Sequence, residues 1–548
     1  MMNLSQVETT LHPALDYDWS LLAPELAVLL TAVVIAVWDL FLGEKNSRRA
    51  LGALAILGVL VAAGLTWGQL GSEPREILGE QFRSDAFAQG FKLLILLAAV
   101  FSLAQVVYSR PVLGRPVRGE HLYLMLAATL GAMIMVSSAD LVPLYVGLET
   151  MSIASYVMAG LHKRHWRSNE AAFKYIVYGA AASATLLYGF SFIYGVTGST
   201  QLFEIGQRLP EAWSSGYSFV LLIGFVLMLV GFGYKISAVP FHTWAPDVYE
   251  GAPIPTVSFL SVVSKAAGFA MMVRVFFLIF YGDAFSSKLE AVGWLLAILA
   301  AASMIVGTTA ALHQVNVKRL LAYSSIAQAG YLLVPFAVMS TLLFDQVWFF
   351  LLAYTLMNMG LFTVLLVVQQ SRDAAEAAAA NTAAAEAAAA AGPEVAGAKP
   401  EEERERMARA PEGDLRLFAG LYHRSPWLAL ATTVLLLSLA GFPFTAGFFG
   451  KLYILFGSIA MGNWWLPAVM IVTTVVSYAF YFKIVRQMYL RPAAEGTALR
   501  VPPVLGLLIA VAAAGTVVFG VFPGLAFDWM QQYLPMLEQF FTTGTPAL

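Results

Sequence analysis

Long apolar stretches recur along the whole sequence, and they constrain its fold more than any other feature. A run of eighteen or more apolar residues can cross roughly 30 Å of hydrocarbon at about 1.5 Å per helical residue. The mean hydropathy of +0.73 is far above that of a soluble protein. We expect spans at residues 21–42, 50–67, 87–108, 121–136, 141–161, 171–194, 219–239, 254–281, 292–312, 320–339, 347–368, 427–457, 466–489 and 501–522. The sequence therefore predicts an all-α integral membrane protein with about fourteen transmembrane helices.

The basic residues predict the orientation of these helices. Lysine and arginine in short loops are retained on the cytoplasmic side of a membrane. Most of the 32 lysine and arginine residues follow odd-numbered spans, while the opposite loops hold only Arg75, Arg83, Arg208 and Lys288. Both termini are therefore predicted to lie outside, at the periplasmic side, and the number of helices should be even.

The composition excludes several kinds of chemistry. The chain has no cysteine, which excludes disulfides and cysteine-ligated iron–sulfur clusters. Its seven histidines lie at predicted helix ends or in loops, so none is placed to hold a haem at mid-membrane. No phosphate-binding glycine motif follows a strand pattern, and the net charge of −2 gives no reason to expect nucleic acid. We expect neither a cofactor nor a metal in this chain, so any redox chemistry belongs to a partner.

Four ionisable residues lie deep inside predicted spans. A lysine or carboxylate at mid-bilayer costs roughly 2.5 to 3.5 kcal/mol, and such residues usually mark ion pathways. Glu149 and Lys265 lie near the centres of their spans, whereas Lys235 and Lys451 stand beside predicted helix breaks. We interpret these four residues as candidates for proton translocation; the alternative is a set of static buried ion pairs.

Other ionisable residues are weaker candidates. Lys174 lies near the cytoplasmic surface, where a lysine can also extend its side chain to water. With His242 and His313 it forms a secondary group of possible proton relays. Lys92 and Arg274 are more typical of helix packing.

Two predicted spans are interrupted at similar places in the two halves of the chain. Pro240 follows Lys235 closely, and Pro443 and Gly447 interrupt the stretch 427–457, which is too long for one straight crossing. Matching broken helices indicate an ion pathway built from inverted repeats. We expect three N-terminal helices in residues 1–120 and a last helix with its tail in 491–548. Between them we expect two five-helix repeats: helices 4–8 in residues 121–285 and helices 9–13 in residues 286–490. Helices 7 and 12 are the discontinuous ones.

An alanine- and glutamate-rich segment at about 371–415 departs from this pattern. Its composition of alanine and charged residues does not support a packed core, so we expect a cytoplasmic insertion that is a solvated helix or a disordered loop.

Several motifs are more specific than the hydropathy pattern. The stretch from Lys235 to Pro253 ends in Pro-Asp-Val-Tyr-Glu-Gly-Ala-Pro, and further motifs run through residues 140–149, 316–330 and 440–451. As a set they resemble the antiporter-like subunits of respiratory complex I, and the first motif is similar to the subunit N branch of that family.

This resemblance implies a function and a setting. The family translocates protons, coupled to NADH-to-quinone electron transfer that uses FMN and iron–sulfur clusters in other subunits. It implies subunits M, K and J as partners, quinone as a substrate of the complex, the bacterial inner membrane as location, and functional roles for Glu149, Lys235, Lys265 and Lys451. An independent cation/proton antiporter, or a related subunit of a membrane-bound hydrogenase or photosynthetic complex, remains open.

Overall fold

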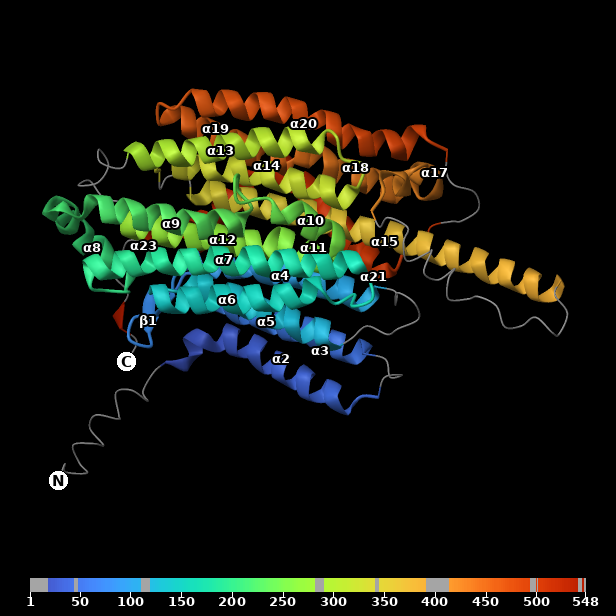
Figure 1. Ribbon diagram of the computed structural model, residues 1–548, viewed down its shortest axis with the longest axis horizontal. Helices are drawn as coiled ribbons and strands as arrows, with labels where there is room; N and C mark the ends of the chain where they lie inside the picture. The colour runs from blue at the N-terminus through green and yellow to red at the C-terminus, as the bar shows by residue number, and fades with distance from the viewer. Residues whose placement is uncertain are drawn as a thin grey trace.

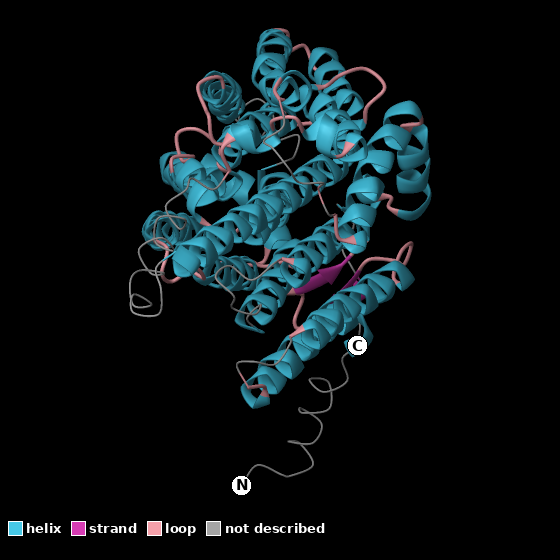
Figure 2. Cartoon of the chain, turned by 90° about the vertical axis from the view of Figure 1, so that its right-hand side faces the viewer, coloured by secondary structure: helices cyan, strands magenta, loops and turns pink. Residues whose placement is uncertain are grey.

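The computed structural model describes residues 18–43, 48–109, 119–280, 290–340, 344–390, 413–492, 499, 501–540 and 545–546. The long helices lie side by side across the molecule in Figure 1, and Figure 2 views the bundle from one end, with several helices seen obliquely. Within this part of the chain, 13 helices are long and apolar enough to cross a membrane. The predicted all-α membrane fold is confirmed.

These crossings follow the predicted spans in order. They are α2 (Ala23–Phe41), α3 (Arg49–Gly68), α4 (Ala86–Tyr108), α5 (Gly119–Ser137), α6 (Leu141–Ala159), α7 (Trp166–Thr197), α8 (Leu202–Ala212) joined through a kink at Gly216 to α9 (Ser218–Ile236), α11 (Ile254–Phe259) continuing into α12 (Lys265–Phe280), α13 (Glu290–Ala311), α14 (Val317–Ala337), α15 (Phe344–Ala390), α20 (Trp465–Leu490) and α21 (Pro503–Val521). The remaining predicted crossing, residues 427–457, consists of two shorter apolar helices, α18 (Pro426–Ala440) and α19 (Ala446–Ala460).

Short elements complete the fold. They are α10 (Trp244–Gly251), α17 (Leu421–Arg424), α22 (Gly524–Tyr533), α23 (Met536–Phe540), the single turns η1 (Trp19–Leu22) and η6 (Leu415–Phe418), the π-helical turns η3 (Trp213–Tyr217) and η4 (Leu260–Ser264), and the strands β1 (Arg75–Ile77), β2 (Phe82–Ser84) and β3 (Thr545–Pro546). The sequence pattern gave no sign of the strands, which form one small sheet in the order β2-β1-β3.

The alanine-rich insertion is partly described. Helix α15 continues past the predicted span as far as Ala390 and extends beyond the bundle, on the right of Figure 1. This agrees with the helical alternative for the first part of the insertion. Residues 391–412, which carry most of its charge, lie outside the described residues.

Helices α5 and α6 pack in the same way as helices α13 and α14. A Cβ atom added to Gly131 would lie 2.5 Å from the backbone nitrogen of Met151, and one added to Gly307 would lie 2.5 Å from that of Ala327. Each glycine therefore lets two helix backbones approach closely. The same numerical offset relates Gly131 to Gly307 and Met151 to Ala327, as expected for two copies of one repeat.

The helix that follows each glycine also begins in the same way. Asp140 caps α6 through Val142 N, and Asn316 caps α14 through Arg319 N. The capping residues are related by the same offset as the two glycines, and each forms an isolated β-bridge with a later loop. These matching contacts support the predicted pair of repeats, whose exact boundaries stay a prediction.

A fully buried charge cluster joins distant parts of the chain at the end of the bundle where the strands lie. Both oxygens of Asp85 accept hydrogen bonds of 2.7 Å from Arg274, and Oδ2 also accepts one of 2.8 Å from Arg83. Arg83 pairs with Glu76 of β1 at 2.7 Å and donates to the Gln539 carbonyl of α23. The cluster therefore connects α4, α12, the small sheet and the C-terminal helix. Arg274 has the packing role that its sequence position suggested.

Replacing Asp85 with asparagine is expected to destabilise the protein by about 3–5 kcal/mol, because two guanidinium groups would lose their buried counter-charge. Burial acts to raise the pKa of Asp85, but the charges of Arg274 and Arg83 lower that pKa to about 2. Its contribution to folding is therefore complete above about pH 4 and is lost as the pH falls toward 2. The thermal denaturation midpoint of the purified protein measures the effect. Asp18→Asn, which removes a partly exposed pair with Arg75, should change stability by less than about 1 kcal/mol; equal effects of the two changes would contradict the assignment.

Candidate functional site

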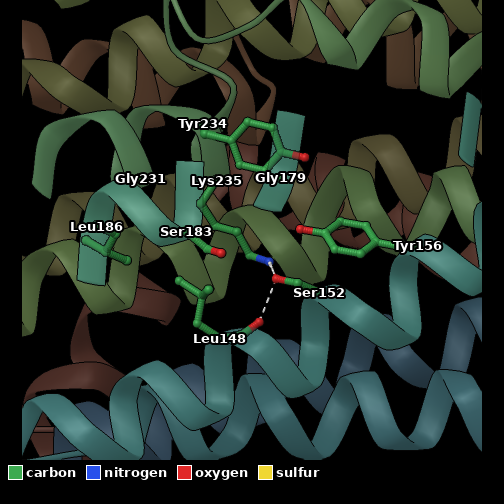
Figure 3. A pocket seen from close by; sticks show the side chains of 9 residues that line it. All are labelled: Leu148, Ser152, Tyr156, Gly179, Ser183, Leu186, Gly231, Tyr234 and Lys235. Atoms are coloured by element: carbon green, nitrogen blue, oxygen red, sulfur yellow. Dashed lines mark hydrogen bonds between the residues drawn. The ribbon is translucent and has the colours of Figure 1, made fainter. Parts of the chain in front are cut away.

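Lys235 lies in the last turn of α9, just before the helix breaks. Its side chain is buried, and its ammonium donates a 2.9 Å hydrogen bond to Ser152 Oγ of α6. Ser152 in turn donates to the Leu148 carbonyl at 2.6 Å, and Figure 3 shows both bonds. A cavity of about 10 Å³, close to the space of one water molecule, adjoins the lysine and is also lined by Tyr156 and Ser183.

Glu149 lies on α6, about one helical turn before Ser152. Among the described residues it forms no direct ion pair with Lys235, although the two side chains are close enough to interact electrostatically. Its Oε1 atom is buried and has no hydrogen-bond partner in the described part of the chain. Glu149 and Lys235 are therefore not joined by a direct ion pair in this arrangement.

Lys265 is the first residue of α12 and follows the π-helical turn η4 directly. Turns of this kind are often found at functional sites. The buried ammonium donates to Ser325 of α14 twice, to Oγ at 2.6 Å and to the backbone carbonyl. It also lies 5.2 Å from the ring centre of Tyr354, whose hydroxyl donates to the same Ser325 Oγ at 2.9 Å.

Lys451 lies on α19, just after the second break. Its ammonium donates to the carbonyls of Leu439 and Ala440 at 2.8 and 3.4 Å, and it faces the ring of Tyr331 at 4.8 Å. These carbonyls belong to the last turn of α18, where no further helical turn supplies N–H donors. The lysine therefore lies at the carbonyl end of a broken helix and binds oxygens that the helix leaves without partners.

The two breaks have the same backbone geometry. Helix α9 ends at the left-handed residue Ser237 (φ 62°), and α18 ends at Gly441 (φ 85°). In each case the N–H of the following residue bonds back to the helix, Ala238 to Gly233 O and Phe442 to Leu437 O. The breaks thus end their helices in the same way.

The predicted helix-breaking residues lie after the two helix ends, and one of them lies at the start of the next helix. Pro240 and Pro443 follow the two helix ends, and Gly447 is the second residue of α19. A Cβ on Gly447 would lie 2.1 Å from Ser438 O, so glycine allows α19 to start against the end of α18. The N–H of Gly447 also binds Ser438 Oγ at 3.0 Å.

Neutral polar side chains that the sequence did not point to lie between Lys265 and Lys451. Ser324, adjacent to the Lys265 partner on α14, forms a short hydrogen bond with Tyr481 of α20. Gln328, one turn further along α14, contacts Tyr481 at 3.5 Å and donates to Leu439 O at 3.2 Å. Leu439 O is the carbonyl that also binds Lys451, so polar groups extend from one lysine to the next.

Lys235 and Lys265 are brought together by the packing of α9 against α12. Gly268, one turn after Lys265, faces the Lys235 stem so closely that an added Cβ would lie 3.2 Å from Cγ of the lysine. The side chain of Lys235 therefore passes across α12 one turn from Lys265. No described hydrogen bond joins the two ammonium groups.

The secondary candidates lie elsewhere. Lys174 is partly exposed and pairs with Glu170 and Asp247 at 2.6 and 2.8 Å. Burial acts to raise the pKa of Asp247, but hydrogen bonds from Lys174 and Arg319 hold that pKa below its usual value. Lys174 thus belongs to a cluster of ion pairs that holds α10, the short helix after the first break, against α7 and α14.

No described hydrogen bond joins His242 or His313 to Lys235, Lys265 or Lys451. His242 lies in the first break and is partly buried, and its Nδ1 atom has no partner among the described residues. His313 follows α13 and is exposed. Lys92 is fully buried and forms a 2.7 Å ion pair with Glu25 of α2, which agrees with the packing role expected of it.

The fold and the row of buried lysines beside broken helices define an antiporter-like membrane subunit. The family model described as "NADH:quinone oxidoreductase/Mrp antiporter, TM" matches residues 138–385 and 404–477. Curated relatives named "NADH-quinone oxidoreductase subunit N" are 45% identical in Geobacillus sp. (strain WCH70), covering 95% of this chain and 100% of the relative, and 36% identical in Bacillus anthracis, covering 97% and 99%. The chain belongs to the subunit N family of NADH-quinone oxidoreductase.

Solved structures agree with this assignment. A chain of respiratory complex I from Thermus thermophilus, with bound aureothin, matches with a TM-score of 0.73 and 29% identity over 94% of this chain and 99% of that chain. A chain of the Mrp complex from Dietzia sp. matches with a TM-score of 0.72 at 18% identity over 95% of this chain and 98% of that chain, which shows a shared fold alone.

Proposed function

We propose that this chain translocates protons as the membrane subunit N of an NADH-quinone oxidoreductase, driven by electron transfer in other subunits. The observation that supports this most directly is the run of buried lysines, each held by hydroxyl or carbonyl oxygens that can pass or receive a proton. A purely structural chain gains nothing from such a run, because each uncompensated lysine is costly to bury.

Glu149 and Lys235 are proposed as the switch. A carboxylate about 6.5 Å from an ammonium interacts by about 2.5 kcal/mol at an effective dielectric near 20. Moving one charge against 100 mV costs about 2.3 kcal/mol, so a change in this separation is large enough to load or release a proton. Lys265 then passes protons toward Lys451, and from there to the outer side.

The proposed location and partner subunits follow from the family. We propose a bacterial inner membrane location, with the basic loops in the cytoplasm and the strand-bearing end outside. The first and last described segments both lie beside the small sheet, through the pairs Arg75–Asp18 and β1–β3, which supports an even number of crossings. The proposed neighbours are subunits M, K and J, and FMN and iron–sulfur clusters belong to partner subunits.

Glu149→Gln is expected to lower proton pumping about tenfold or more in the assembled complex, since it removes a charge interaction of about 2.5 kcal/mol. Proteoliposomes energised with NADH and a soluble quinone measure the rate. Glu204→Gln, which alters an exposed pair with Arg208, is the control and should pump normally. Full pumping by the Glu149 variant would contradict the proposed switch.

An independent cation/proton antiporter is the second candidate, because the matching family model includes Mrp antiporters. Purification of the tagged chain from native membranes separates the two. Co-purifying flavin and iron–sulfur absorbance supports the oxidoreductase, whereas a preparation without them supports the antiporter.

A further inference from the structure

Ser325 of α14 occupies the place in the second repeat that Glu149 of α6 occupies in the first. The glycine contacts relate Gly131 and Met151 of the first repeat to Gly307 and Ala327 of the second. Gly131 also faces the carbonyl oxygen of Gly147, two positions before Glu149. Gly307 likewise faces the carbonyl oxygen of Tyr323, two positions before Ser325. The same offset carries Glu149 onto Ser325. The correspondence therefore rests on atomic contacts in addition to sequence spacing.

Each of these two positions lies beside a buried lysine, but their chemistry differs. In the first repeat, Lys235 has a carboxylate one turn from its hydrogen-bond partner Ser152. In the second repeat, Ser325 directly binds the ammonium of Lys265, a residue of the first repeat, through both its hydroxyl and its backbone carbonyl. Among the described residues, no carboxylate forms an ion pair with Lys265.

The hydroxyl of Ser325 is well placed to connect several groups. A serine hydroxyl can accept two hydrogen bonds and donate one. Lys265 and Tyr354 supply the two donors, and Tyr249 of α10 lies 3.5 Å away as a partner for the remaining hydrogen. All these neighbours are uncharged apart from the lysine itself.

We infer that Ser325 is a positioning residue that holds the Lys265 ammonium without a counter-charge, so that this lysine can release the proton it receives. A carboxylate at this place would stabilise the charged lysine and retain its proton. A hydroxyl orients the group and leaves its charge uncompensated. The first repeat thus provides a charged switch at Glu149, and the second provides a neutral relay at Ser325. This inference rests on the proposed proton path.

The test compares Ser325→Asp with Ser325→Asn in the purified complex, reconstituted in proteoliposomes. The two side chains have nearly the same size and differ in charge. We expect S325D to lower the rate of pumping about tenfold or more, and S325N to retain at least about a third of it. Equal pumping by S325D and S325N would overturn the inference.

A second pair of variants tests the role of Ser325 if S325D and S325N both prevent assembly of the complex. S325A removes the hydroxyl and is expected to reduce pumping several-fold, while S325T restores the hydroxyl and should restore the rate. Wild-type pumping by S325A would also overturn the inference. K265A separates the proposed role of Lys265 from the proposed role of Ser325. If K265A pumps normally, the proposed function of Lys265 fails; if K265A is inactive while S325D pumps like S325N, only the role of Ser325 fails.

Discussion

Complexes that carry Lys235→Ala are expected to lose proton pumping, with a rate at least about a hundredfold below wild type, because we propose that the buried ammonium receives the proton near Glu149. Removing it leaves Ser152 without its donor and Glu149 without its neighbouring charge. The loss combines a missing proton carrier with a pair interaction of about 2.5 kcal/mol, and each 1.4 kcal/mol corresponds to about tenfold.

Lys235→Arg separates the need for charge from the need for titration. Arginine keeps a positive charge beside Glu149, but it stays protonated throughout the physiological range. A static ion pair would tolerate this change, whereas a proton carrier would not. We therefore expect K235R to assemble normally and to pump as poorly as K235A. Pumping by K235R near the wild-type rate would mean that Lys235 provides charge alone.

Replacement of Lys451 is expected to have a comparably large effect, at the other end of the row. Its ammonium is the described donor to the carbonyl of Ala440 and shares that of Leu439 with Gln328. Lys451→Ala should lose pumping and also reduce stability by about 1–3 kcal/mol, because buried carbonyls at the break lose a donor.

Lys451→Arg tests these two effects independently. Arginine can still donate to carbonyls at the end of α18, so stability should return toward that of the wild type while pumping stays low. Thermal denaturation and NADH-driven proton uptake, measured on the same preparation, give both values. Recovery of both together would assign Lys451 a structural role.

Much of the fold could be predicted because the membrane imposes simple rules. Span length and hydropathy predicted the crossings, including the long stretch 427–457 that proved to be two half-helices. Lys235, Lys265 and Lys451 were detectable because a buried charge is expensive and therefore rare. The structure buries all three side chains inside the protein, while their roles stay a prediction.

The uncharged residues of the proposed proton path could not be predicted in the same way. Ser152, Ser325 and Gln328 carry no charge, and such residues are common at helix contacts in membranes. Their importance depends on which lysine or carbonyl each one meets, and those contacts join helices far apart in the sequence. The partners of Arg274 were hidden for the same reason, since Asp85 lies 189 positions away.

We propose that Lys235, Lys265 and Lys451 belong to one hydrated proton path. Lys265 binds Ser325, and the adjacent Ser324 begins a series of hydrogen bonds through Tyr481 and Gln328 to the Leu439 carbonyl that binds Lys451. No described hydrogen bond joins Lys235 to Lys265, so the stretch between these two lysines is the decisive one. The most direct measurement is a density map of the assembled complex at a resolution that shows ordered water. We expect water molecules to join the two ammonium groups beside Gly268; continuous apolar packing without water between them would show that the two lysines do not share a path.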